Sequence, residues 1–199
     1  MLALTNLASI DDDARDPIIR EAWANIDDLL LSNNKMVTRA TVELICNLMQ
    51  SPNGVAKFAD GSRQASNRLH ILLALADAED FATRRAAGGA LASLTEWDAA
   101  VTAVLERERG VKILLKLCAE DEEELRHRGV VCILNLLSIP GDVGKKALEK
   151  VNGDDGIEVL KECLKKSRNQ EVLEITVEAL KKLMGGGEMI ALDQAAKAA

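Results

Sequence analysis

The chain has 199 residues, and 48% of them are hydrophobic, so it can bury a substantial core. Aromatic residues make up only 2% and Tyr is absent, which leaves Leu, Val, Ile and Ala to build that core and favours packed helices over a sheet. The net charge of −7 argues against a nucleic-acid partner and against electrostatic docking on an anionic membrane.

Apolar periodicity predicts helices along the whole chain, separated by short turns rich in Gly, Pro, Asp and Asn. Pro52 and Pro140 are expected to open short helices, where a missing N–H costs little. Asp16, followed by Pro17, is expected to cap the helix that runs to Ser32. In chain order the expected helices span residues 1–9, 16–32, 35–50, 52–59, 62–76, 79–96, 98–108, 110–121, 122–139, 140–151, 156–167 and 169–184.

One helix type recurs along the chain, with an apolar stripe beside a polar position. Its apolar anchors lie 41, 46, 42 and 47 residues apart, which is the period of helical solenoids of armadillo or HEAT type. Three helices per unit, one short and two long, favour the armadillo pattern over the two-helix HEAT pattern. The anchors are Leu4, Ile45, Leu91, Ile133 and Leu180.

The sequence therefore predicts an all-α, armadillo-type right-handed α-solenoid over residues 1–184. The expected units are a partial repeat at 1–9 and full repeats at 10–51, 52–97, 98–139 and 140–184. The second unit shows only two clear helices. Residues 185–199, which begin with three glycines, are expected to form a flexible tail or a short helix.

The chain is expected to begin inside a repeat, as a C-terminal fragment of a longer array, because the first unit is a third helix alone. A solenoid unit buries its apolar face against its neighbours. We therefore expect Leu2, Leu4 and Leu7 to be partly exposed.

The polar position of the third helices holds Asn6, Asn47, Ser93, Asn135 and Lys182. In a three-helix solenoid the third helices line the concave face. An amide both donates and accepts, so a row of Asn side chains could hold the backbone of an extended peptide. Two alternatives stay open: each Asn ties its helix to the neighbouring repeat, or it faces solvent.

Cationic residues stand near the start of three third helices: Arg39, Arg85 and His127, with Arg84 and Arg128 adjacent to two of them. They strengthen the groove interpretation in an acidic chain. The alternative is that they pair with Glu43, Asp80 or Glu124 on the same or an adjacent helix.

The residue pattern predicts no enzyme, metal or cofactor. The cysteines Cys46, Cys118, Cys132 and Cys163 lie in apolar helical runs and read as small buried hydrophobes in a reducing compartment. No apolar run is long enough to span a bilayer, and no basic leader precedes the first apolar stretch. We expect a cytoplasmic binding module.

Three stretches, "ELICNLM", "RRAAGGALASLT" and "HRGVVCILNLL", resemble the C-terminal armadillo region of UCS-domain proteins, the chaperones directed at myosin motors. The resemblance covers roughly residues 39–184. It implies binding of the myosin motor domain in a groove, promotion of its folding and protection against aggregation. Asn6, Asn47 and Asn135 match the groove positions of the armadillo pattern, whereas Ser93 and Lys182 depart from it.

In animal members of this family an N-terminal TPR domain recruits a heat-shock chaperone. No TPR domain is present here, so such a chaperone is expected to be reached only indirectly. The rival hypothesis is a general armadillo adaptor for an extended peptide. Import receptors of that kind carry Trp along their third helices, whereas Trp23 falls in a second helix and Trp97 at the end of a third. A scaffold without a groove ligand is a third possibility.

Overall fold

The computed structural model describes the backbone of residues 2–198 and the side chains of residues 2–185. These residues form thirteen α-helices and no β-strand, which confirms the all-α expectation. The chain divides into two compact units, residues 1–103 and 104–199, which are described in turn. No helix in the described residues is both long enough and apolar enough to cross a membrane.

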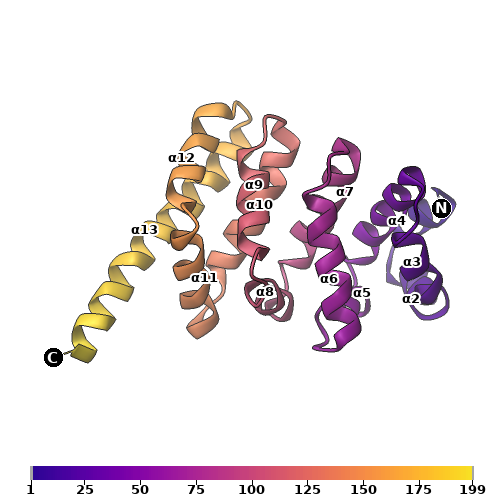
Figure 1. The fold of residues 1–199 in the computed structure, drawn as a ribbon, viewed down its shortest axis with the longest axis horizontal. Coiled ribbons are helices and arrows are strands. Elements are labelled where there is room, and N and C mark those ends of the chain that lie inside the picture. Colours follow the sequence, from indigo (N-terminus) through magenta and orange to yellow (C-terminus); the bar gives the residue numbers. More distant parts are fainter. Residues whose placement is uncertain (1, 199) are drawn as a thin grey trace. The chain divides into compact units, whose positions relative to one another are not determined.

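Unit 1 contains seven complete helices and the start of an eighth (Figure 1). Ser51, Ser62, Asp80 and Asn34 each accept a hydrogen bond from a backbone N–H of the helix that follows, so side-chain caps set where these helices begin. The helices are α1 (Leu2–Ala8), α2 (Asp12–Glu21), α3 (Trp23–Leu30), α4 (Lys35–Leu48), α5 (Pro52–Ala59), α6 (Arg63–Ala76), α7 (Phe81–Leu94) and α8 (Asp98–Leu105).

The second repeat has three helices, where the sequence suggested two. The expected helix from Asp16 to Ser32 is divided at Ala22 into α2 and α3. Asp16 does not cap it: Asp11 caps α2 by accepting from the Ala14 N–H, and Pro17 lies inside the helix. The acidic run before Pro17 offered several cap candidates, and Asp16 instead accepts a hydrogen bond from the Asn53 side chain at 3.0 Å. The three-helix armadillo pattern therefore holds in this repeat as well.

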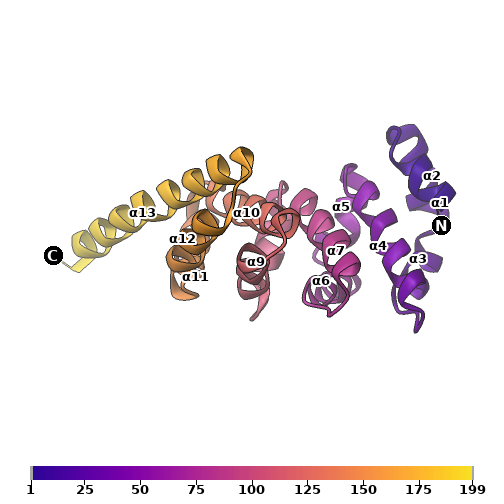
Figure 2. The same cartoon turned by 90° about the horizontal axis from the view of Figure 1, so that it is seen from above.

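The core of unit 1 is built around α4. This helix packs against α3 of its own repeat and lies between the third helices α1 and α7 (Figure 2). Leu44, Ile45 and Leu48 are fully buried there. In contrast, Leu2 and Leu7 on α1 are 73% and 43% exposed, as expected for that helix.

A second contact region of unit 1 joins α3 to the following repeat. The Trp23 ring lies edge-on to Phe58 of α5, with the ring centroids 6.0 Å apart. Arg68 of α6 lies over the same indole and forms a two-pronged ion pair with Asp27. A planar guanidinium can stack and bind a carboxylate at once, so one Arg fixes the spacing between two second helices.

Unit 2 repeats this plan, with α10 in the central position. The helix α10 packs against α9 and α13, and α12 packs against both of those helices. Its core includes Leu114, Leu117, Ile133 and Leu136, all at most 1% exposed. The helices are α9 (Gly110–Ala119), α10 (Glu123–Ser138), α11 (Gly141–Gly153), α12 (Gly156–Lys166) and α13 (Gln170–Ala198).

The helix α13 is longer than the sequence suggested. We expected the third helix of this repeat to end near Met184, at three glycines, but α13 continues through them to Ala198. Helical backbone at these glycines needs no special conformation, so the residues need not end the helix. The side chains beyond Gly185 lie outside the described residues, and the assignment of residues 185–199 to a separate tail stays a prediction.

Gly129, in the "HRGVV" stretch, marks a close approach between α9 and α10. A Cβ at this position would lie 2.5 Å from the Cys118 backbone nitrogen and 2.8 Å from the Leu117 carbonyl carbon. Only Gly allows the two helices to come this near, because backbone atoms cannot rotate away as a flexible side chain would. The stretch that carries the family resemblance therefore includes a packing requirement.

Replacing Gly129 by Ala should destabilise unit 2 by about 1–3 kcal/mol, because the added methyl forces α9 and α10 apart. Urea denaturation followed by circular dichroism measures this loss. Gly153→Ala is the matched control, since nothing lies within 4 Å of a Cβ built there. Equal stability of the two variants would contradict the close-approach argument.

Candidate functional site

The predicted site residues lie on third helices. In unit 1, Asn6 is on α1, Asn47 on α4 and Ser93 on α7, with Arg39 and Arg85 nearer the amino-terminal ends of α4 and α7. Because α4 contacts both α1 and α7, these residues belong to three adjacent helices. In unit 2, Asn135, His127 and Arg128 all lie on α10.

Asn47 ties its helix to the neighbouring repeat. Its side-chain Nδ2 donates a 2.8 Å hydrogen bond to the backbone oxygen of Thr5 in α1. The amide N–H group of Asn47 therefore has the role that the sequence left open as a tie to the neighbouring repeat. The acceptor half, Oδ1, receives no hydrogen bond from the described residues.

The other polar positions differ from Asn47 in their surroundings. Asn6 is exposed, Ser93 and Asn135 are half-buried, and neither the Asn6 amide nor the Ser93 hydroxyl bonds a described residue. The polar row is thus not uniform: its members share a helix position but not one hydrogen-bonding role.

Two of the predicted cations pair on their own helix. Arg39 Nε lies 3.0 Å from Glu43 Oε1, and Arg128 Nη2 lies 2.7 Å from Glu124 Oε1, each four residues apart. Glu43 and Glu124 are two of the partners that the sequence analysis gave as the alternative to a role in the groove. Such exposed pairs add little stability, about 0.3–0.5 kcal/mol.

The two remaining predicted cations are half-buried. His127 Nε2 on α10 lies 3.5 Å from Glu171 Oε1 on α13, so this contact joins neighbouring third helices. Arg85 lies on α7 with its side chain half-buried.

Sequence reasoning underrated a pair of arginines that lie 42 residues apart. Arg84 Nη1 donates to the carbonyl oxygens of Ala78 and Glu79, and Arg126 Nη1 donates to those of Glu120 and Asp121. Each guanidinium thus binds two carbonyl oxygens of the turn that follows a second helix. The available signal was the equivalent placement of the two residues: Arg84 begins "RRAAGGALASLT", and Arg126 directly precedes "HRGVVCILNLL".

Arg126 also links two repeats of unit 2, and the residue is only 4% exposed. Its Nε donates to Ser167 Oγ at 3.1 Å. Beside it, Glu123 Oε1 accepts from the backbone N–H groups of Arg168 and Asn169 at 2.8 and 2.7 Å. These hydrogen bonds hold the pKa of Glu123 below its usual range, with smaller contributions from nearby arginines.

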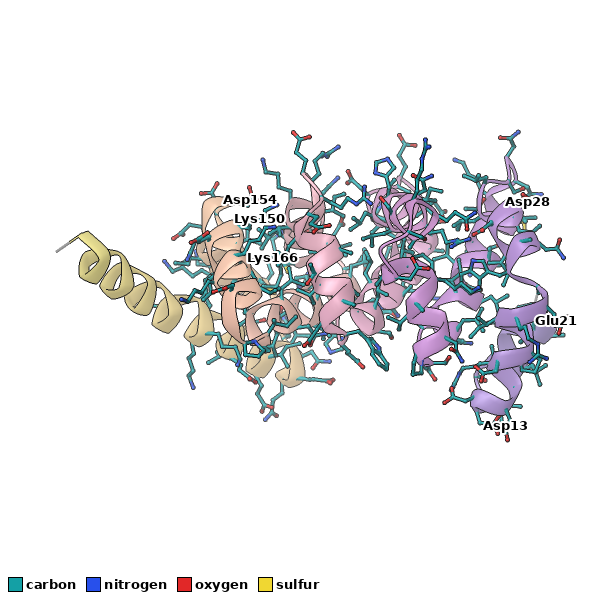
Figure 3. All side chains as sticks on the ribbon, turned by 90° about the horizontal axis from the view of Figure 1, so that it is seen from below. Asp13, Glu21, Asp28, Lys150, Asp154 and Lys166 are labelled. Atoms are coloured by element: carbon teal, nitrogen blue, oxygen red, sulfur yellow. The ribbon has the colours of Figure 1, made fainter. Side chains whose placement is uncertain are left out.

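Lys166, labelled in Figure 3, adds a further contact between the same two repeats of unit 2. Its Nζ lies 2.8 Å from Asp121 Oδ1 and 3.2 Å from the Ala119 oxygen. The turn before α10 and the turn before α13 are therefore fixed together by charged groups on both sides.

The cysteines lie where small apolar side chains belong. Cys118, Cys132 and Cys163 are buried and Cys46 is half-buried, and none of these four described residues forms a disulfide. Burial raises the pKa of the Cys118 thiol well above its usual value, which disfavours the reactive thiolate. Within the described residues, no three His, Cys, Asp or Glu side chains are grouped to hold a metal ion.

The structure thus has the features of a helical-repeat protein. No family model matches the chain. Ring assembly protein 3 of Schizosaccharomyces pombe is 41% identical over 139 residues, which are 69% of this chain and 19% of that protein. The solved structure of UNC-45 from Drosophila melanogaster is 28% identical and covers 96% of this chain and 23% of its own, with a TM-score of 0.79.

A third comparison supports the fold alone. A solved structure of the UNC-45 chaperone, described by molecular features critical for binding and folding muscle myosin, is 22% identical. It covers 92% of this chain and 20% of its own, with a TM-score of 0.78.

These relatives confirm the resemblance drawn from the sequence. The chain belongs to the UCS-domain family and corresponds to part of its armadillo-type repeat region. It spans about a fifth of the length of the curated relatives that it matches.

Replacing Asn47 by Ala should loosen α1 without unfolding unit 1, because it removes one hydrogen bond worth about 0.5–1.5 kcal/mol. Amide hydrogen exchange should show protection of residues 2–8 falling about two- to tenfold, while α7 is unaffected. Asn6→Ala is the control, since that exposed amide bonds no described residue. Unchanged exchange in α1 would show that the tie contributes nothing.

The Glu123 cap should make unit 2 sensitive to acid. Its pKa is lower in the folded state, so the ionised carboxylate stabilises the fold above the unfolded-state pKa of about 4.3. That contribution is lost as the pH falls through the lower folded-state value. The urea midpoint of Glu123→Gln should therefore lie below that of the parent at pH 6, and the gap should narrow at pH 3.

Glu122→Gln is the matched control, because the neighbouring Glu122 side chain makes no hydrogen bond to a described residue. It should follow the parent at both pH values. A gap between Glu123→Gln and the parent that is independent of pH would contradict the assignment to the carboxylate charge.

Proposed function

We propose that this chain is the client-binding part of a myosin-directed chaperone. Its third helices hold partly folded segments of a myosin motor domain, promote folding of the motor and prevent its aggregation. The observation that carries the proposal is the match to UNC-45 over 96% of the chain at 28% identity. An UNC-45 chaperone is itself described as binding and folding muscle myosin.

The polar row gives the proposal a physical mechanism. A partly folded client has unpaired backbone N–H and C=O groups, and side chains that need no particular client sequence can satisfy them. In unit 1 the Asn6 amide, the Asn47 Oδ1 and the Ser93 hydroxyl are available for such contacts. Each bond is worth about 0.5–1.5 kcal/mol, so the affinity is modest and tolerant of sequence.

The same features favour binding over catalysis and protein over other partners. Three of the four thiols are buried, and several surface carboxylates are engaged in helix caps or ion pairs. These features support a role in binding rather than in catalysis. The charge of −7 opposes nucleic acid and anionic membranes. We place the protein in the cytoplasm, where myosin motors act, and a heat-shock chaperone would reach this segment only indirectly.

A general armadillo adaptor is the less favoured alternative. Peptide-binding grooves of the import-receptor type use exposed Trp side chains to sandwich Lys stems. Here Trp23 is 5% exposed and packed against Phe58, so it serves the core. Trp97 is 37% exposed but lies past the end of α7.

Replacing both Asn6 and Ser93 by Ala should weaken the suppression of heat-induced myosin motor aggregation about fivefold or more, because two contacts to the client backbone are lost. These positions are preferable to Asn47 and Asn135, which have partners within the fold. The measurement is light scattering of a heated motor domain against chaperone concentration.

Asn25→Ala on α3 is the matched control, because it removes an exposed amide from a second helix. Circular dichroism confirms that all variants keep their helicity. If the double variant protects the motor as well as the parent and Asn25→Ala do, the polar row does not bind the client.

A further inference from the structure

A pocket of about 380 Å³ lies within unit 1, at the opposite end of α4 from Asn47. It is bounded by the α3–α4 turn and the α6–α7 turn, so two adjacent repeats form its walls. This volume lies at the lower end of the range for ligand-binding pockets. The lining residues used below are Leu31, Lys35, Thr38, Ile71, Leu75 and Glu79.

Apolar side chains form much of the pocket lining. Ile71 and Leu75 on α6 are half-buried, and Leu31 at the mouth is 66% exposed. Met36 and Phe81, next in sequence to the lining residues Lys35 and Asp80, are 80% and 39% exposed. Exposed large apolar side chains in a pocket lining, or next in sequence to it, indicate a protein-interaction surface larger than a small molecule would cover.

Both walls of the pocket are held in place by hydrogen bonds. Thr38 Oγ1 donates to the Ser32 oxygen at 2.9 Å, and Asn34 caps α4 through the Met36 N–H. Across the pocket, Arg84 Nη1 donates to the Ala78 and Glu79 oxygens, each at 2.9 Å. The pocket is therefore preformed, which lowers the entropic cost of binding.

Opposite charges stand at the mouth of the pocket. Lys35 begins α4, and Glu79 lies in the α6–α7 turn. Both are exposed, and neither forms an ion pair with a described residue. The adjacent Asp80 carboxylate already accepts hydrogen bonds from the Thr83 side chain and backbone N–H. These bonds hold the pKa of Asp80 below its usual range, with smaller contributions from Arg39 and Lys35.

We propose that this pocket binds an extended segment of a protein client through one apolar anchor, with an acidic residue on one side meeting Lys35 and a basic residue on the other meeting Glu79. The apolar floor supplies affinity, and the two charges fix the direction of the segment. The inference deepens the proposed function and rests on it, because it names a site at which a client segment is held.

The test uses two short capped peptides, each with Leu-Phe at its centre. One carries Glu before and Lys after the centre, and the other has these two exchanged. Methyl NMR of the full chain should show shifts at Ile71 and Leu75 with the preferred peptide. The parent should prefer one charge order by about two- to fivefold per charge, the range for exposed ion pairs.

Charge reversal makes the assignment specific. Lys35→Glu and Glu79→Lys should each weaken binding of the preferred peptide, and the double reversal should prefer the other charge order. Arg63→Glu at the start of α6 and Asp13→Lys on α2 are controls of equal charge change at exposed positions of unit 1 that do not line the pocket; Asp13 lies at the surface (Figure 3). Both controls should bind as the parent does.

Three outcomes would overturn the proposal: no shift at Ile71 or Leu75 with either peptide, an unchanged charge preference in the double reversal, or shifts that depend on protein concentration alone. The last would make a second copy of the chain the occupant. No arm uses myosin, so failure here leaves the client proposal standing, and the two tests fail in distinguishable ways.

Discussion

Unit 1 depends on the burial of the third helix α4 against two neighbouring third helices at once. In α4, Leu44, Ile45 and Leu48 are fully buried between α1, α3 and α7, and no single repeat supplies all of those contacts. Hydrophobic burial of about 25 cal/mol per Å² is gained only when adjacent repeats are in register.

Polar side chains set the register that the apolar core alone would leave loose. Apolar contacts are not directional, whereas a hydrogen bond to a particular carbonyl allows one spacing only. Asn47 on α4 reaches α1, Arg68 on α6 reaches Asp27 on α3, and Arg126 on α10 reaches Ser167 before α13. Each of these three pairs of neighbouring repeats is therefore joined by such a contact. A buried Arg without its partners would be costly, which makes a slipped register unfavourable.

Sequence periodicity located the helices because apolar spacing and caps are local signals. Pro52 after Ser51, and Ser62 before α6, marked helix starts that the structure confirms. The division at Ala22 was missed because no Gly or Pro accompanies it. The Arg126 contacts and the pocket beside Leu75 could not be predicted, since they depend on which turns meet across repeats, and a single sequence carries no direct record of that. For Asn47, the sequence left three roles open, and the hydrogen bond to Thr5 shows one of them.

The groove position and the pocket lie near opposite ends of the same helix, and this separation sets what a client segment must look like. From Thr38 to Asn47 the helix rises roughly 14 Å, at 1.5 Å per residue. An extended chain covers that distance in about four residues. A segment that placed an apolar anchor near Thr38 would therefore reach Asn47 Oδ1 with its backbone about four residues away. Selection would act at the anchor and its flanking charges, while the residues between need only an accessible backbone, which is how one surface can be tolerant of sequence and still hold a client in one direction.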